Sequence, residues 1–160
     1  EYAAQEKLPV VVVLDNVRSA QNVGSFFRTA DAFGIERIAL CGISATPPNR
    51  EIHKTALGSE QSVAWEYHSS TLDCVAKLRE AGYRIIAVEQ IEGAVMLDDF
   101  RVEAGAKYAL IFGNEVEGVD QVVADEVDGA IEIPQVGTKH SLNVSVSAGV
   151  LMWELFRQLR

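Results

Sequence analysis

Residues 8–14 read LPVVVVL, an uncharged run dominated by β-branched side chains. A continuous apolar run of this length is typical of a strand that is buried on both faces of a parallel sheet. Residues 22–33 follow with apolar side chains at helical spacing, and Gly34 is well placed to end that helix. This strand–helix unit predicts an α/β fold.

The same alternation continues along the chain. Further strands are predicted over residues 37–41, 63–67, 83–89, 108–113 and 130–134, and further helices over residues 71–81, 121–127 and 143–159. Thr71 can cap the helix that starts there, and the Pro47-Pro48 pair excludes regular structure around it. Strands separated by helical crossovers predict a mostly parallel sheet with helices on both faces. No repeat or linker interrupts the pattern, so we expect a single domain over residues 1–160.

The composition is that of a globular protein, with 48% hydrophobic and 23% charged residues among 160. No apolar run is long enough to span a membrane, and no secretory leader opens the chain. Cys41, Cys74 and the three histidines show no metal-ligand spacing, which favours neither a disulfide framework nor a metal site. We therefore expect a cytoplasmic protein with no metal and no membrane contact.

Charge is distributed unevenly along the chain. The formal net charge is −9, which by itself argues against a nucleic-acid partner. Residues 89–132, however, contain twelve acidic and two basic residues, so the rest of the chain has a net charge of +1. Two interpretations stay open: a local phosphate-binding surface made by the first and last segments, or ordinary solvated charge throughout.

Three loops that follow predicted strands are rich in glycine and in amide side chains. They read DNVRSAQNVG at residues 15–24, GNEVEGVD at residues 113–120 and IPQVGTKHSLN at residues 133–143. Ligands bind beyond the carboxyl ends of the strands in such sheets, so we expect these loops to form one site. No GxGxxG follows the first strand and no GxxxxGK[ST] is present, so the sequence lacks the dinucleotide and P-loop fingerprints.

The three loops resemble the motifs of the SpoU (TrmH-like) branch of the SPOUT RNA methyltransferases. The first motif, N…NxGxxxR-[ST]-A, is matched by Asn16, Asn22, Gly24, Arg28, Thr29 and Ala30. The second, G-[NA]-E-x-x-G, is matched by Gly113, Asn114, Glu115 and Gly118. The third, IPxxGxxxSLNVSVxxG, is matched by Ile133, Pro134, Gly137, Ser141, Leu142, Asn143, Val144, Ser145, Val146 and Gly149. The three motifs occur in the family's order within about residues 10–157.

This resemblance implies an enzyme that transfers a methyl group from S-adenosyl-L-methionine to a ribose 2′-hydroxyl of tRNA or rRNA. A guanosine in the tRNA D-loop is the best-known target of such enzymes, so tRNA is expected before rRNA. The resemblance also implies a homodimer and a C-terminal trefoil knot, a rare topology that the strand pattern does not predict. Two alternatives stay open, a non-catalytic RNA-binding member of the fold and another α/β nucleotide-binding enzyme.

The resemblance and the local charge also assign roles to individual residues. Four are expected to be catalytic: Arg28, Glu115, Ser141 and Asn143. Six are expected to bind the cofactor: Gly113, Asn114, Ile133, Leu142, Gly118 and, without a motif letter to fix it, Glu89. Four are expected to contact RNA: Asn16, Arg18, Asn22 and Lys139.

Structural roles are also open to these residues, and those of the asparagines and Ser141 are compatible with the functional ones. Arginine stays protonated, so Arg28 is a poor general base and is better suited to gripping phosphate and stabilising a forming oxyanion. Its structural alternative is an ion pair with Asp31, one helical turn on. The other structural alternatives are turn formation or helix capping by Asn16, Asn22, Ser141 and Asn143, and capping of the following backbone by Glu115.

The last predicted helix, residues 143–159, is apolar around most of its circumference. Such a helix must be covered on more than one side, either by its own core or by a partner. Together with the resemblance, this pattern predicts a two-fold dimer through the helix, with the helix that carries Arg28 near the partner's site.

Overall fold

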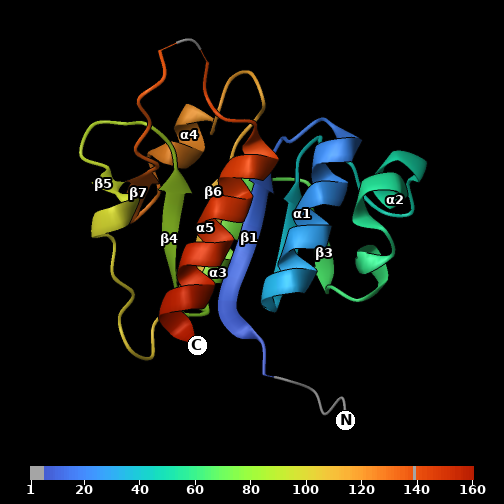
Figure 1. Ribbon diagram of the computed structural model, residues 1–160, viewed down its shortest axis with the longest axis horizontal. Helices are drawn as coiled ribbons and strands as arrows, with labels where there is room; N and C mark the ends of the chain where they lie inside the picture. The colour runs from blue at the N-terminus through green and yellow to red at the C-terminus, as the bar shows by residue number, and fades with distance from the viewer. Residues whose placement is uncertain (1–5, 139) are drawn as a thin grey trace.

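The computed structural model describes residues 6–138 and 140–160 (Figure 1). Its strands are β1 (Leu8–Asp15), β2 (Ile35–Cys41), β3 (Trp65–His68), β4 (Tyr83–Val88), β5 (Val95–Met96), β6 (Lys107–Phe112) and β7 (Gly129–Glu132). Its helices are α1 (Ala20–Phe33), α2 (Arg50–Ala56), α3 (Thr71–Glu80), α4 (Gln121–Ala124) and α5 (Val144–Leu159), with short 3-10 helices η1 (Ser59–Gln61) and η2 (Leu97–Asp99).

In the described part of the chain, these strands form one sheet in the order β3-β2-β1-β6-β4-β7-β5, and all its pairings are parallel. The central strand β1 is buried on both faces. Val10, Val12 and Leu14 enter one core layer, whereas Val11 and Val13 enter the other. This double burial explains the unbroken apolar run and confirms the predicted α/β fold.

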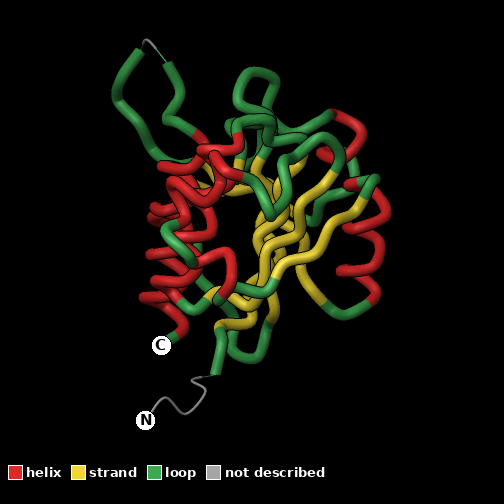
Figure 2. The backbone as a smooth tube through the Cα atoms, turned by 90° about the vertical axis from the view of Figure 1, so that its right-hand side faces the viewer, coloured by secondary structure: helices red, strands yellow, loops and turns green. Residues whose placement is uncertain are grey.

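Helices cover both faces of the sheet (Figure 2). Helices α1 and α5 lie against one face, where Phe26 and Leu151 join the same core layer. Helices α3 and α4 cover the other face through Val75 and Val123. Helix α2 lies on the outer side of α1 (Figure 1). No helix among the described residues is both long and apolar enough to cross a membrane.

The strand order brings the predicted loops together. Strand β6 lies between β1 and β4, and β7 lies between β4 and β5, although each follows its neighbours in sequence. Because all these strands are parallel, their carboxyl ends and the loops that follow meet at one edge. The trefoil knot concerns how the loops thread past one another, and it stays a prediction.

Several predicted boundaries are wrong. The strand expected at residues 63–67 begins at Trp65. Val63 is buried but belongs to the turn after η1, because its N–H donates to the Ser59 carbonyl. Ser70, not Thr71, caps α3 by accepting from the Asp73 N–H. The helix expected at residues 121–127 ends at Ala124.

Helix α2 and strand β5 were not predicted. Helix α2 spans seven residues, of which only Ile52 and Ala56 are buried. Two apolar positions are too few to establish a helical period. Strand β5 has two residues, both exposed, so no burial pattern marks it.

Candidate active site

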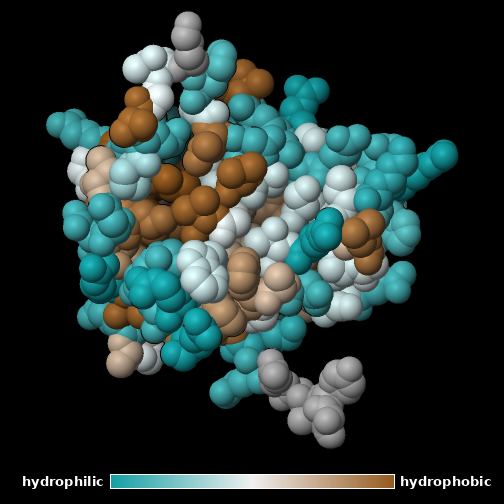
Figure 3. All heavy atoms as spheres, viewed as in Figure 1, coloured by the Kyte–Doolittle hydropathy of each residue, from teal (hydrophilic) through white to brown (hydrophobic). Residues whose placement is uncertain are grey.

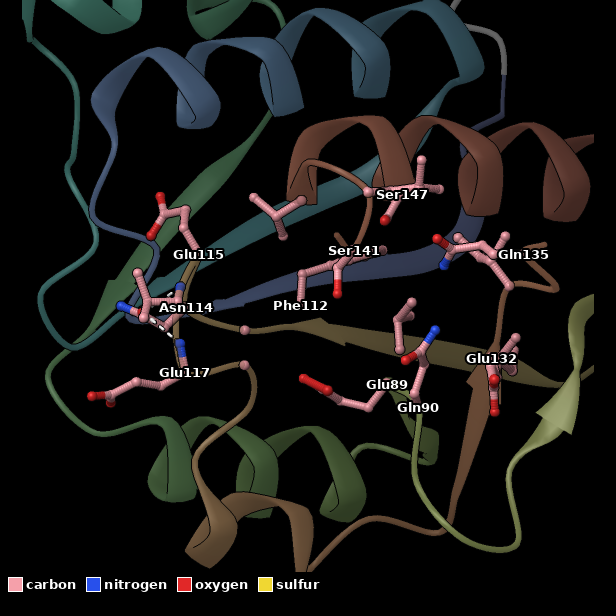
Figure 4. Close-up of a pocket in the computed structure, with 18 residues that line it drawn as sticks. Glu89, Gln90, Phe112, Asn114, Glu115, Glu117, Glu132, Gln135, Ser141 and Ser147 are labelled. Atoms are coloured by element: carbon pink, nitrogen blue, oxygen red, sulfur yellow. Dashed lines mark hydrogen bonds between the residues drawn. The ribbon is translucent and has the colours of Figure 1, made fainter. Parts of the chain in front are cut away.

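A cavity of about 290 Å³ opens at the carboxyl ends of β4, β6 and β7 (Figure 4). All six residues predicted to bind the cofactor line this cavity: Glu89, Gly113, Asn114, Gly118, Ile133 and Leu142. The predicted catalytic residues Glu115 and Ser141 line it as well. We refer to this space as the main cavity.

Two glycines allow the backbone to fold tightly beside the main cavity. A Cβ atom on Gly113 would lie 2.1 Å from the Gly118 carbonyl carbon and from the Val119 nitrogen. Gly118 has φ +74°, and a Cβ there would lie 2.4 Å from Glu89 Oε2. That same oxygen accepts from the Val119 N–H at 2.8 Å. The loop after β6 can therefore reach the end of β4 only if both positions lack a side chain.

If the main cavity binds the cofactor that the sequence resemblance implies, Gly118→Ala should weaken that binding about tenfold, because the methyl group forces Glu89 or the loop out of the cavity wall. Calorimetric titration measures this change. Gly105→Ala is the matched control, since Gly105 also has positive φ (+79°) but nothing lies within 4 Å of its Cβ position. An equal loss of affinity in both variants would mean that backbone strain, and not the contact with Glu89, determines the result, and no loss in Gly118→Ala would contradict the prediction.

Asn114 organises the turn after β6. Its Oδ1 accepts from the N–H groups of Val116 and Glu117 at 2.9 and 3.0 Å. Its Nδ2 donates to the Asn16 carbonyl at 2.9 Å, which joins this turn to the loop after β1. The local capping role considered for Glu115 is therefore performed by Asn114.

Glu115 crosses from this turn to the start of α1. Its Oε1 accepts from the Arg18 N–H at 3.1 Å, and its Oε2 accepts from the Ser19 N–H at 2.8 Å and from Asn22 Nδ2 at 3.3 Å. Burial opposes ionisation, but the hydrogen bonds from Ser19, Arg18 and Asn22 outweigh it, so the pKa of the Glu115 carboxyl is lowered. A negative charge at a helix N-terminus is also favoured by the helix dipole.

Ser19 was missed in the sequence analysis. Its hydroxyl caps α1 by accepting from the Asn22 N–H at 3.1 Å. The available signal was a serine four residues before Val23, where the apolar period of the helix starts.

A chain of side-chain contacts joins all three loops. Asn22, which donates to Glu115, accepts from Asn143 Nδ2 at 3.3 Å. Asn143 Oδ1 in turn accepts from the Ser145 N–H at 2.9 Å and caps α5, as its structural alternative predicted. Glu115, Asn22 and Asn143 therefore hold the three motifs in one arrangement.

Asn16 shapes the loop after β1. It has φ +58°, a conformation that asparagine tolerates better than most residues, and its Oδ1 accepts from the Ile43 N–H at 2.9 Å. A Cβ on Gly42 would lie 2.0 Å from that oxygen. The structure therefore confirms a turn-forming role for the Asn16 side chain, which is compatible with RNA contact, and that contact stays a prediction.

Asp15 was also missed by sequence reasoning. This carboxylate is 1% exposed, accepts from Thr71 Oγ1 at 2.6 Å, and accepts from the Asp120 N–H at 2.9 Å. It therefore ties β1 to α3 and to the loop that follows β6. Its signal was an acidic residue directly after a fully buried strand.

The structure does not bring Arg28 into the main cavity. Arg28 is exposed on α1, and its side chain forms no hydrogen bond or ion pair with any described residue, so the pair with Asp31 is absent there. Arg18 lies on the other side of the 114–118 turn, where it lines a cavity of about 430 Å³. Lys139 lies outside the described residues.

Comparisons with known sequences agree with the motif assignment. The model of the SpoU rRNA Methylase family matches residues 9–153. A Staphylococcus saprophyticus protein assigned to the TrmH family of tRNA/rRNA methyltransferases is 31% identical over 156 residues. The match covers 97% of this chain and 61% of that protein, so the chain spans about three fifths of the length of such relatives.

Two solved structures share the fold over almost the whole chain. The AdoMet-bound rRNA methyltransferase of Sinorhizobium meliloti has a TM-score of 0.88 and 31% identity, covering 98% of this chain and 58% of that one. A structure described for 2-OH methylation of C/U34 on tRNA has a TM-score of 0.83 and 27% identity, covering 94% and 95%. Because the family model matches nearly the whole chain, and its motifs meet at one edge of the sheet, this chain belongs to the SpoU rRNA methylase family.

Proposed function

We propose that this chain transfers a methyl group from S-adenosyl-L-methionine to a ribose 2′-hydroxyl of tRNA. The observation that carries the proposal is the main cavity, which gathers every predicted cofactor-binding residue beside Glu115 and Ser141. The Sinorhizobium meliloti relative is AdoMet-bound, which supports the cofactor. The relative described for 2-OH methylation on tRNA is covered over 95% of its length, which favours tRNA and the 2′-oxygen.

The residues around the main cavity fit the proposed cofactor. Ile133 and Leu142 provide apolar surface for an adenine ring. The carboxylate of Glu89 can accept hydrogen bonds from ribose hydroxyls (Figure 4). Gln90 adds an amide at the same rim. The lining of the main cavity is more polar than apolar, which suits a cofactor that carries hydroxyl and charged groups beside its adenine ring.

The protein's part in the reaction is to position the ribose and to stabilise charge. When bound, S-adenosyl-L-methionine supplies a methyl group on a positively charged sulfur, and the carbon–sulfur bond breaks as the 2′-oxygen bonds to the methyl carbon. Glu115 is a poor base because its oxygens already accept three hydrogen bonds and its pKa is lowered. Ser141 lines the cavity and can hydrogen-bond the attacking hydroxyl, whose proton passes to water.

We place Arg28 at the site through a two-fold dimer. Val146, Val150 and Trp153 expose apolar side chains along α5, and we call them the α5 surface. Figure 3 shows apolar side chains gathered on this face of the molecule. Helix α1, which carries Arg28, packs beside α5. Pairing two α5 surfaces would bring the exposed Arg28 of one protomer toward the main cavity of its partner, where it can bind phosphate and stabilise the developing oxyanion.

The proposed function is tested by methyl transfer from labelled S-adenosyl-L-methionine to total tRNA and to rRNA, followed by nucleoside analysis. We expect label in a 2′-O-methylated nucleoside of tRNA. Label in a base would contradict the ribose assignment, and label in rRNA alone would contradict the choice of tRNA. Cofactor binding without any transfer would favour the non-catalytic RNA-binding alternative.

The change Val150→Glu is expected to convert the dimer to monomers, because it places a charge in an apolar interface, and to lower methyl transfer at least about tenfold. Sedimentation at micromolar concentration and activity are measured on the same samples. Val122→Glu is the matched control, since Val122 is also exposed but lies on α4, across the sheet. A monomeric wild-type protein with full activity would refute the shared site.

RNA affinity is expected to fall steeply with salt despite the net charge of −9, because cations on the protein displace counterions from phosphates. The change Arg18→Ala should make the slope of log affinity against log salt shallower by about one. Filter binding at several salt concentrations measures the slope. A wild-type slope near zero would mean that the acidic composition is the better guide and that RNA is not the ligand.

A further inference from the structure

A cavity of about 460 Å³ lies away from the main cavity, between α2, the loop that precedes it, η1 and strand β3. We call it the α2 cavity. Its walls include Pro47, Pro48, Arg50, Glu60 and Trp65, none of which has a role in the proposed methyl transfer. In a nucleotide site, apolar rings can stack on the base, and charged side chains can bind its polar edge and its phosphate.

Trp65 provides a flat apolar wall. It is the first residue of β3, which forms one edge of the sheet, and it pairs in register with Ile38. Ile38 packs in the core layer on the α1 side, so Trp65 faces that same side. Trp65 is 36% exposed, and Pro47 and Pro48 line the same space. An exposed tryptophan in an apolar cavity is a stacking surface for a base.

Glu60 provides an unused hydrogen-bond acceptor. Its side chain is only 11% exposed, and its Oε2 lies 2.7 Å from His53 Nδ1. Its Oε1 is the only buried side-chain nitrogen or oxygen without a hydrogen-bond partner among the described residues. A buried acceptor left without a donor is costly, and a carboxylate can only accept. Because Glu60 lines the α2 cavity, a small rotation of its carboxylate would let Oε1 accept from a ligand that presents N–H groups.

Arg50 provides positive charge at the same place. It is exposed on the first turn of α2 and has no ion-pair partner in the described part of the chain. A guanidinium that is free in this way can bind a phosphate with two parallel hydrogen bonds.

Helix α2 is also fixed to the first turn of α1. Thr55 Oγ1 donates to the Gln21 carbonyl at 2.8 Å, and Gln21 Nε2 donates to Glu51 Oε1 at 3.1 Å. A nucleic-acid strand bound in the α2 cavity would therefore lie at a fixed position relative to the first motif.

We propose that the α2 cavity binds one unpaired guanine of the RNA, stacked on Trp65, with its N1–H and N2–H donating to Glu60 and an adjacent phosphate on Arg50. Guanine is favoured because its edge presents two neighbouring N–H donors to a carboxylate. Adenine, cytosine and uracil place an acceptor beside their donor, which would face the carboxylate oxygens unfavourably. The inference rests on the proposed function, since it takes the guanine to belong to the substrate RNA.

The first test uses free mononucleotides and needs no methyl transfer. The chain contains two tryptophans, so a Trp153→Phe background leaves Trp65 as the only tryptophan fluorophore. We expect GMP to quench this fluorescence saturably, with at least about fivefold higher affinity than AMP, CMP or UMP. Glu60→Gln should remove the preference, because the amide replaces one acceptor with a donor. No quenching by any nucleotide, or equal quenching by all four, would overturn the proposal.

The second test uses steady-state methyl transfer to tRNA. Trp65→Ala should raise the KM for tRNA about tenfold with little change in kcat, and Trp65→Phe should restore most of the affinity, because a stacking surface remains. An unchanged KM in Trp65→Ala would overturn the proposal even in an active enzyme. GMP binding without methyl transfer would support the guanine site while refuting the proposed function, so the two failures are distinguishable.

Discussion

Replacing Arg28 with alanine is expected to lower methyl transfer about a hundred- to a thousandfold. Loss of one group that stabilises developing negative charge commonly has an effect of this size. Arg28 is exposed and its side chain forms no hydrogen bond or ion pair with the described residues, so its removal deletes no visible contact from the fold. The melting temperature and the affinity for S-adenosyl-L-methionine should therefore stay close to those of the wild type. Single-turnover methyl transfer and calorimetry measure these quantities.

Two further variants show what Arg28 contributes. Arg28→Lys should restore little activity, because a point charge lacks the planar fork that binds phosphate at two positions. Asp31→Ala is the control for a charge change on the same exposed face of α1 and should keep near-wild-type activity. A fully active lysine variant would contradict the fork argument. A fully active alanine variant would remove Arg28 from the mechanism.

The change Glu115→Gln is expected to lower methyl transfer about a hundredfold and to weaken cofactor binding. Glutamine keeps one carbonyl oxygen, but its NH₂ group would face the N–H of Arg18 or Ser19, which are both donors. The loop after β6 would then separate from the start of α1. Activity and amide hydrogen exchange at Ser19 and Asn22 measure the change, and exchange there should become faster.

Glu92→Gln is the control for this loss of charge, because Glu92 is exposed and accepts no hydrogen bond from the described side chains or backbone. It should leave activity and exchange unchanged. If Glu115→Gln kept wild-type activity despite faster exchange, the link between the loops would not be needed for catalysis.

The pH dependence of this contact follows from the lowered pKa of Glu115. The carboxylate is bonded in the folded protein, so its stabilising contribution is present above its unfolded pKa of about 4.3 and is lost as the pH falls through the lower folded value. Amide exchange at Ser19, corrected for its intrinsic pH dependence, should therefore show an acid step below the ordinary glutamate pKa in the wild type. Glu115→Gln should lack this step.

Much of the fold was encoded locally. The apolar run of β1, the period of α1 and the glycine after it are short-range patterns, and they predicted those elements to within two residues. Capping of α5 by Asn143 is likewise a contact between near neighbours in sequence. Helix α2 escaped prediction because two buried positions do not define a period.

The amino-acid pattern alone predicted the class of fold, the edge of the sheet where a site would form, and the motifs that identify the family. Which side chains meet at that edge depends on contacts between residues far apart in the chain. Glu115 bonds the start of α1 across 96 positions, and it can do so because β6 lies next to β1 in the sheet. Arg28 lies outside the main cavity of its own chain, although Asn22 from the same motif donates a hydrogen bond to Glu115. Local patterns record period and burial, whereas strand order and the packing of crossovers determine which distant residues come into contact.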